Sequence, residues 1–264
     1  MALSRRRFLA AGGGIAVLGA GGLVAVRRLD DPETADDWGI PAVPAGTVRF
    51  EQVDSVRRGS TVDLFTAVPA GHGDGAGLPV CLVLHGASGR PADYSTFGLP
   101  QFLAAAVRGG APPFVLAGAD GGSQSWSPVG ADDPQGMLLE EMPGWLTERG
   151  FDVTRLAAWG WSMGGYGALR LAQVAPGRLR AVAVFSPAVR PDDAVTADAE
   201  ALGGTPVGVW CGTEDPFYPA VRSLVDSLPE PLAAGAYARG AGHTRTYLSS
   251  ITLEAFGFLG SHLV

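Results

Sequence analysis

A serine flanked by glycines is the clearest chemical signal in this sequence. Residues 160–164 read Gly-Trp-Ser-Met-Gly, and they follow a short apolar stretch that begins at Leu156. The pattern Gly-x-Ser-x-Gly between a strand and a helix is typical of a nucleophile elbow, a sharp turn that exposes the serine hydroxyl. The chain contains 39 Gly, so this short pattern could occur by chance. The stronger evidence is that a strand is expected directly before it and a helix directly after it. Ser162 is therefore the candidate nucleophile.

A nucleophilic serine needs a base to take its proton and an acid to orient that base. Downstream of Ser162, His243 lies in a glycine-rich loop after the last expected strand, whereas His262 lies on the final helix, where we expect it to face solvent. The loop after the preceding strand carries Glu214 and Asp215. The order serine, acid, histidine fits either carboxylate. We favour Asp215, with Glu214 as the alternative.

Backbone N–H groups beside the serine would have to stabilise the oxyanion of an acyl-transfer reaction. The N–H of Met163 is one candidate, because it belongs to the residue after the nucleophile. The loop that follows the third strand reads His85-Gly86-Ala87, and Gly86 lets the backbone turn close to the site. The N–H of Ala87 is the second predicted donor, and His85 is expected to pack beneath the turn rather than act as a base.

The site is expected to be open. Only 16 residues lie between Val189 and Pro206, which is too few to build a separate cap domain over the site. The loop over residues 121–136 and nearby aromatic side chains would then form its walls. Each of these aromatic residues could equally belong to the core. The candidates are Trp126, Trp161, Phe217 and Tyr218.

Strand and helix patterns alternate from Thr47 to the end, which predicts an α/β fold with a mostly parallel, doubly wound sheet in a single domain. Cys81 and Cys211 lie in apolar strands, where we expect core thiols rather than a disulfide or a metal site. The expected strands are Thr47–Val53, Thr61–Val68, Pro79–Leu84, Phe114–Ala119, the stretch leading to residue 160, Ala181–Phe185, Pro206–Cys211 and Ala233–Tyr237. The expected helices are Pro100–Val107, Met137–Arg149, Gly165–Val174, Ala220–Leu228 and Leu248–His262.

The N-terminal segment resembles an export signal. Residues 4–9 read Ser-Arg-Arg-Arg-Phe-Leu, and a glycine-rich apolar run follows as far as Val26. This favours a twin-arginine signal peptide or anchor over residues 1–29, with an acidic linker at 30–46 and a catalytic domain at 47–264. A transmembrane helix is the alternative, but the glycines weaken it. The protein would be exported to the cell envelope or medium, and its N-terminal segment would allow membrane association.

Composition narrows the possible partners. The formal net charge is −7, and all 19 basic residues are Arg. A chain this acidic lacks the basic surface that nucleic-acid binding requires. The sequence implies no metal and no organic cofactor, and it leaves the oligomeric state open.

Several motifs together resemble the putative-esterase (esterase D-like) family of α/β-hydrolases. Glu140-Glu141-x-Pro143 precedes the serine motif, which continues as Gly165-Tyr166-Gly167-Ala168. The other matching pieces are His85-Gly86, Asp120-Gly121-Gly122 with Trp126, Cys211-Gly212-Thr213-Glu214-Asp215, and Gly242-His243. The resemblance implies the α/β-hydrolase fold and a triad of Ser162, Asp215 and His243. Many members carry an aromatic residue soon after the histidine, whereas this chain reads Thr244-Arg245-Thr246-Tyr247.

The predicted function is hydrolysis of carboxylic esters through an acyl-enzyme, acting on a small-molecule or lipid ester. The family resembled also contains secreted mycolyltransferases, so acyl transfer to cell-envelope lipids or sugars is the first alternative. A non-catalytic envelope binding protein is the second. Complete triad candidates in the required order argue against it, because a binding protein has no need of all three.

Overall fold

The computed structural model describes residues 15–19, 22–26 and 38–264. The chain divides into two units, Met1–Thr34 and Ala35–Val264. In the first unit, strand β1 (Ile15–Gly19) pairs with β2 (Gly22–Val26) as an antiparallel hairpin.

The predicted twin-arginine motif at residues 4–9 lies outside the described residues, as does the first part of the predicted linker, up to residue 37. The part of the predicted signal segment that the structure describes is the β1–β2 hairpin. Among the described residues, no helix is both long enough and apolar enough to cross a membrane.

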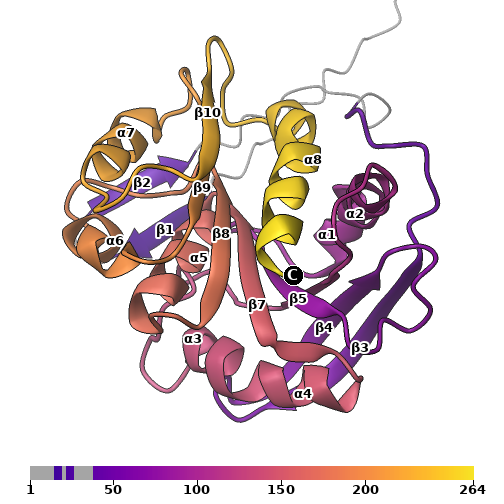
Figure 1. Cartoon of the computed structure of the whole chain (residues 1–264). Coiled ribbons are helices and arrows are strands. Elements are labelled where there is room, and N and C mark those ends of the chain that lie inside the picture. Colours follow the sequence, from indigo (N-terminus) through magenta and orange to yellow (C-terminus); the bar gives the residue numbers. More distant parts are fainter. Residues whose placement is uncertain (1–14, 20–21, 27–37) are drawn as a thin grey trace, which may run out of the picture. The chain divides into compact units, whose positions relative to one another are not determined.

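An eight-stranded sheet forms the centre of the second unit, in the order β10-β9-β8-β7-β5-β6-β4-β3 (Figure 1). β4 runs antiparallel to both its neighbours, and the other pairs are parallel. The mostly parallel sheet predicted from the sequence is therefore confirmed. The strands are β3 (Thr47–Ser55), β4 (Ser60–Val68), β5 (Pro79–Leu84), β6 (Val115–Ala119), β7 (Asp152–Trp161), β8 (Leu179–Phe185), β9 (Val207–Gly212) and β10 (Ala234–Ala238).

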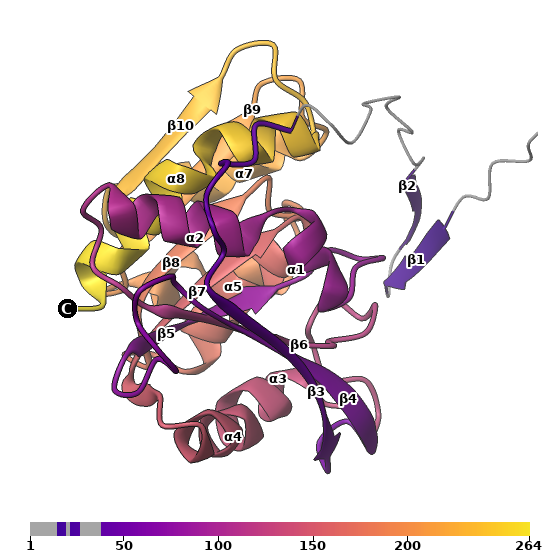
Figure 2. The same ribbon diagram turned by 90° about the vertical axis from the view of Figure 1, so that its right-hand side faces the viewer.

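Helices cover both faces of this sheet (Figure 2). One face packs against α1 (Ala92–Thr96), α2 (Leu99–Arg108) and α8 (Arg245–His262). The other face packs against α4 (Met142–Glu148), α5 (Met163–Val174) and α7 (Tyr218–Asp226). Helices on both faces explain why the central strands read as continuous apolar runs.

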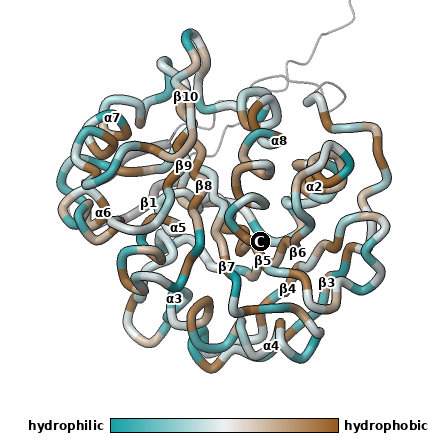
Figure 3. Tube along the Cα trace, viewed as in Figure 1, coloured by the Kyte–Doolittle hydropathy of each residue, from teal (hydrophilic) through white to brown (hydrophobic). Residues whose placement is uncertain are grey.

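Strand β5 shows how one apolar run serves two cores. Val80, Leu82 and Leu84 point into the core on the α5 side, whereas Cys81 and Val83 point into the core on the α8 side. Successive side chains of a strand alternate between faces, so both sets must be apolar. Figure 3 shows hydrophobic residues gathered along the central strands. Both cysteines are free and buried, as expected.

The predicted helix Met137–Arg149 is not one regular α-helix: it divides into a π-helical turn and a shorter α-helix, and another short helix precedes it. A short helix α3 (Pro134–Gly136) leads into a π-helical turn at Met137–Glu141, and α4 follows. Pro143 has no N–H to donate, so a regular α-helical pattern cannot run through this point. The N–H of Met142 instead bonds to the carbonyl of Met137, five residues back.

The π-helical turn directs Glu141 at the turn between β3 and β4. Its carboxylate accepts the N–H groups of Val56 and Arg57 at 2.8 and 3.1 Å, and the Ser55 hydroxyl at 2.5 Å. These bonds connect the antiparallel edge of the sheet to the segment before β7. Glu141 therefore has a structural role: it holds the turn between two strands that are distant from it in sequence.

The segment between Val189 and Pro206 folds as two short helices, α6 (Ala194–Ala197) and a 3₁₀ turn at Ala199–Leu202. The amide of Gln173 on α5 donates to the Val195 and Asp198 carbonyls at 2.9 and 2.8 Å. This segment is therefore held against α5, and it forms no separate cap domain.

Residues 38–46, the second half of the predicted linker, belong to the folded unit. Ile40 packs so closely on Gly98 that a Cβ at that glycine would lie 2.6 Å from its side chain. The Trp38 ring lies against the guanidinium of Arg245. The folded unit thus begins before Thr47, the start predicted from the sequence. Apolar residues here were too few to signal packing.

Candidate active site

Ser162 sits between β7 and α5 in a backbone conformation that few non-glycine residues adopt, with φ 58° and ψ −121°. Such strain persists only where surrounding contacts impose it. The Ser162 N–H donates to the Phe185 carbonyl at 3.0 Å, and its carbonyl accepts the N–H groups of Tyr166 and Ala188 at 3.1 and 2.9 Å. These three bonds hold the turn in place from two neighbouring segments.

The two motif glycines allow strand and helix to approach each other. A Cβ at Gly160 would lie 2.1 Å from the Gly164 carbonyl oxygen, and a Cβ at Gly164 would lie 1.9 Å from the Leu84 carbonyl oxygen. Both separations are far below contact distance, so no side chain fits at either position. The sequence pattern is thus explained by packing of α5 against the ends of β5 and β7.

Asp215 and His243 form a hydrogen-bonded pair. The Nδ1 atom of His243 lies 2.8 Å from Oδ2 of Asp215, whose side chain is fully buried. Burial alone would raise the pKa of Asp215, but the bonds from His243, from the Ser186 hydroxyl and from the Phe217 N–H outweigh it and lower this pKa below its usual value. Asp215 therefore stays ionised and holds the imidazole in one orientation.

The alternative carboxylate, Glu214, is exposed. Its N–H bonds to the Ala241 carbonyl at 2.9 Å, which joins the loop after β9 to the loop that carries His243. The structure thus brings Asp215, and not Glu214, to the histidine.

Two of the predicted wall residues flank His243. The Trp161 ring stacks on the imidazole with centroids 5.2 Å apart, and the Phe217 ring meets it edge-on at 5.5 Å. Trp161 directly precedes Ser162, so the stacking places His243 beside the elbow. Tyr218 packs instead against Tyr237.

Trp126 is a core residue, since only 1% of its surface is exposed. Its indole fills the space that Cβ atoms would need at Gly121 and Gly167, and its Nε1 donates to the His85 carbonyl at 3.1 Å. A buried ring offers no surface to a substrate. The expectation that Trp126 forms a wall gives way to the alternative left open by the sequence, a packing role in the core.

His85 is also a buried packing residue, as predicted from the sequence. Its Nε2 accepts the Gly121 N–H at 2.9 Å, and its Nδ1 lies 2.8 Å from the Gly86 carbonyl. Both ring nitrogens are thereby bound to backbone. His85 fixes the loop that leads to Ala87.

The predicted oxyanion donors lie on either side of the elbow. Met163 is the first residue of α5, whose N-terminal N–H groups have no partner within the helix. Gly86 lies opposite, and a Cβ built on it would come 3.8 Å from the Ser162 Cβ. Ala87 is the next residue. Their role as oxyanion donors stays a prediction.

Sequence reasoning missed Ser186, which follows β8 directly. It is buried, has a positive φ of 42° and bonds through its hydroxyl to Asp215. The sequence did contain one signal for this role: Ser186 is a polar residue directly after a buried strand, at the edge of the sheet where Ser162 lies.

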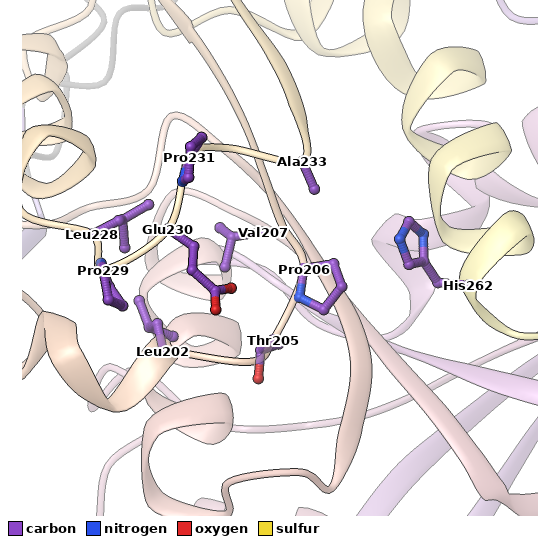
Figure 4. Close-up of a pocket in the computed structure, with 10 residues that line it drawn as sticks. All are labelled: Leu202, Thr205, Pro206, Val207, Leu228, Pro229, Glu230, Pro231, Ala233 and His262. Carbon is purple, nitrogen blue, oxygen red and sulfur yellow. The ribbon is translucent and has the colours of Figure 1, made fainter.

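A separate hollow lies far from this chemistry, where β9 and β10 begin (Figure 4). Ser162 follows the carboxyl end of the parallel strand β7, so this hollow is at the opposite edge of the sheet. It is lined by Leu202, Thr205, Pro206, Val207, Leu228, Pro229, Glu230, Pro231, Ala233 and His262.

Solved structures with the same fold include several esterases. An S-formylglutathione hydrolase from Agrobacterium tumefaciens superposes with a TM-score of 0.70 at 16% identity, covering 85% of this chain and 98% of the other. A feruloyl esterase module from Clostridium thermocellum, bound to sinapinate, gives 0.70 at 16% identity, with coverage of 84% and 91%. A fluorophosphonate-binding serine hydrolase from Staphylococcus aureus gives 0.64 at 15%, with coverage of 81% and 98%. These likenesses confirm the α/β-hydrolase fold.

No curated protein sequence matches the chain. A family model described as putative esterase matches residues 55–229, which is well over half of the chain and includes Ser162 and Asp215. The chain therefore belongs to the putative esterase family, and this membership supports hydrolysis of carboxylic esters.

Proposed function

We propose that the enzyme hydrolyses esters through an acyl-enzyme on Ser162. The observation that carries this proposal is the strained serine turn beside a histidine whose Nδ1 is held by Asp215 at 2.8 Å. With Nδ1 bound to the carboxylate, the imidazole presents Nε2 as the atom that exchanges a proton with the serine.

In the proposed reaction the Ser162 oxygen attacks the ester carbonyl while its proton passes to Nε2 of His243. The negative charge on the carbonyl oxygen is stabilised by the N–H groups of Met163 and Ala87. Collapse of this intermediate breaks the bond to the alcohol, which leaves with the proton from His243. Water then repeats the sequence, releases the acid and restores the serine.

Labelling tests the nucleophile directly. A fluorophosphonate should add once to the wild-type protein, at Ser162, as read by intact mass and peptide mapping. Ser162→Ala should remain unlabelled. Labelling at another serine, or at more than one, would contradict the assignment.

We propose that the preferred esters have short to medium acyl chains and that water is the acceptor. The segment between β8 and β9 builds no cap, so a long chain would gain little burial, at about 0.8 kcal/mol per buried methylene. On p-nitrophenyl esters, kcat/KM should peak at short to medium length. A steady rise with length, or preferred transfer to an added sugar, would favour the acyltransferase instead.

We also propose export by the twin-arginine route, on the strength of residues 4–9. Such a signal is read by a receptor as an address, so charge alone should not replace it. Changing Arg5 and Arg6 together to Lys should leave the protein inside the cell, as measured by fractionation. Continued export of the double variant would point to another pathway.

A further inference from the structure

Arg245, two residues after the catalytic histidine, is held by aromatic rings. Its guanidinium carbon lies 4.6 Å from the ring centroid of Trp38 and 4.6 Å from that of Phe97. These rings come from segments far apart in sequence, residues 38–46 and the turn after α1. Contacts with ring faces fix the guanidinium plane and leave its N–H groups, which lie in that plane, free for other partners.

The ring cluster continues to the catalytic residues. Phe97 packs edge-on against Trp161 at 5.7 Å, and Trp161 stacks on His243 at 5.2 Å. Arg245, Phe97, Trp161 and His243 therefore form one continuous wall. Through these rings the guanidinium is linked to His243 and to Trp161, the residue before Ser162.

Arg245 differs from the other ring-stacked arginine. Arg222 lies over Tyr237 at 5.1 Å and also pairs with Asp226 at 3.6 Å. Within the described residues, Arg245 has no carboxylate partner at ion-pair distance. It is only partly exposed. A guanidinium that two rings hold, with no carboxylate partner among the described residues, is suited to bind a carboxylate or a phosphate.

We propose that Arg245 binds an anionic group on the alcohol portion of the ester, and so determines substrate class. This proposal rests on the proposed function, because the mechanism decides whether the alcohol or the acyl portion of the ester lies near His243. His243 must hand its proton to the leaving oxygen, so the alcohol lies on the His243 side, and the ring cluster that holds Arg245 ends on His243. The protein as a whole carries a net charge of −7 and repels anions, so selectivity for one must come from such a local cation.

Matched esters test the proposal. 3-Acetoxybenzoate and 3-acetoxyphenyl phosphate carry the anion on the alcohol, and 3-acetoxybenzamide is the neutral counterpart. The wild-type ratio of kcat/KM, anionic over neutral, should be about tenfold, mainly through KM, given the strength of a partly exposed charged hydrogen bond. Arg245→Met should bring this ratio close to one, and Arg245→Lys should keep part of it. The two anionic esters show whether carboxylate or phosphate is preferred.

Arg108→Met is the matched control, because it removes the same charge at the exposed far end of α2. It should leave the ratio at the wild-type value. A second pair, 4-nitrophenyl hydrogen glutarate and 4-nitrophenyl valerate, places the carboxylate on the acyl side, where no advantage is expected. A ratio near one in the wild type, or a ratio that survives in Arg245→Met, overturns the proposal. An advantage confined to the acyl side does so too.

A binding measurement separates this proposal from the esterase function. Calorimetry with the Ser162→Ala protein should show tighter binding of 3-hydroxybenzoate than of 3-hydroxybenzamide, and the added Arg245→Met change should abolish the difference. Equal binding of the two alcohols overturns the role of Arg245 even if esters are cleaved. Failure to cleave 3-acetoxybenzamide instead contradicts the proposed function.

Discussion

His85 and His243 are two histidines in loops at the same edge of the sheet, each near a carboxylate. His85 follows β5, with its Nε2 3.7 Å from Asp120, and His243 follows β10, with its Nδ1 2.8 Å from Asp215. The His85 side chain is 1% exposed and the His243 side chain 18% exposed. One ring is closed off in the core, and the other opens to solvent.

The difference lies in what binds each ring nitrogen. In His85, Nε2 accepts a backbone N–H, so the proton must sit on Nδ1 and donate to the Gly86 carbonyl. Because Nε2 is already an acceptor, it cannot donate to Asp120 while the ring is neutral. In His243 the carboxylate takes Nδ1, and Nε2 is left for proton transfer. A histidine beside an acid is catalytic only when one nitrogen can change its protonation state.

The largest effect is expected when the imidazole of His243, the proposed base, is removed. His243→Ala should lower kcat by about 10⁶, because triad members act as a unit. Ester hydrolysis assayed with purified protein, together with thermal unfolding, checks this. The melting temperature should change little, and a loss of activity explained by unfolding would contradict the assignment.

Replacing each acid by its amide should affect activity in the Asp215–His243 pair much more than in the Asp120–His85 pair. Asp215→Asn should lower kcat by roughly 10⁴, because the amide favours the wrong tautomer of the catalytic ring. Asp120→Asn and the exposed Glu214→Gln should each have a much smaller effect. Steady-state kinetics of the three variants decide the matter, and a larger loss in Glu214→Gln would mean that the other carboxylate is the acid.

His85→Ala should act on stability. It leaves the buried Gly121 N–H without its acceptor, at a cost of about 1–3 kcal/mol, in addition to the cavity it creates. Urea unfolding measures this loss. His72→Ala, in the loop between β4 and β5, is the control and should be nearly neutral. If His85→Ala unfolds like the wild type, the ring does not support the loop.

The smallest effect concerns Asp120. The Gly122 N–H, which donates to its carboxylate at 2.8 Å, and the charge of Arg58 keep the pKa of Asp120 below its usual value. A pKa lowered in the folded state adds stability above the unfolded value near 3.9, and this contribution is lost as pH falls through the lower folded value. The side chain is half exposed, so we expect less than about 1 kcal/mol. Asp120→Asn should be less stable than wild type by urea unfolding at pH 7, with the gap narrowing towards pH 2.

The sequence alone determined the order of strands and helices along the chain, and it was enough to name Ser162 and His243 as the proposed nucleophile and base. The elbow is a local feature, since Gly160 and Gly164 are required by contacts within a few residues of Ser162 and with one neighbouring strand. Apolar runs with helical patterns between them likewise predict a two-sided sheet. His243 followed because it was the one remaining histidine in a suitable loop.

Tertiary structure decided the rest. Glu214 and Asp215 are adjacent, and only the packing of their loop against the ends of β8 and β10 turns one inward and the other out. The residue type of Trp126 does not reveal whether its ring contacts a substrate or, as here, fills the space next to two glycines. Trp38 meets Arg245 across about two hundred residues of sequence. Side-chain direction in loops depends on contacts that are distant in sequence, and no local pattern records them.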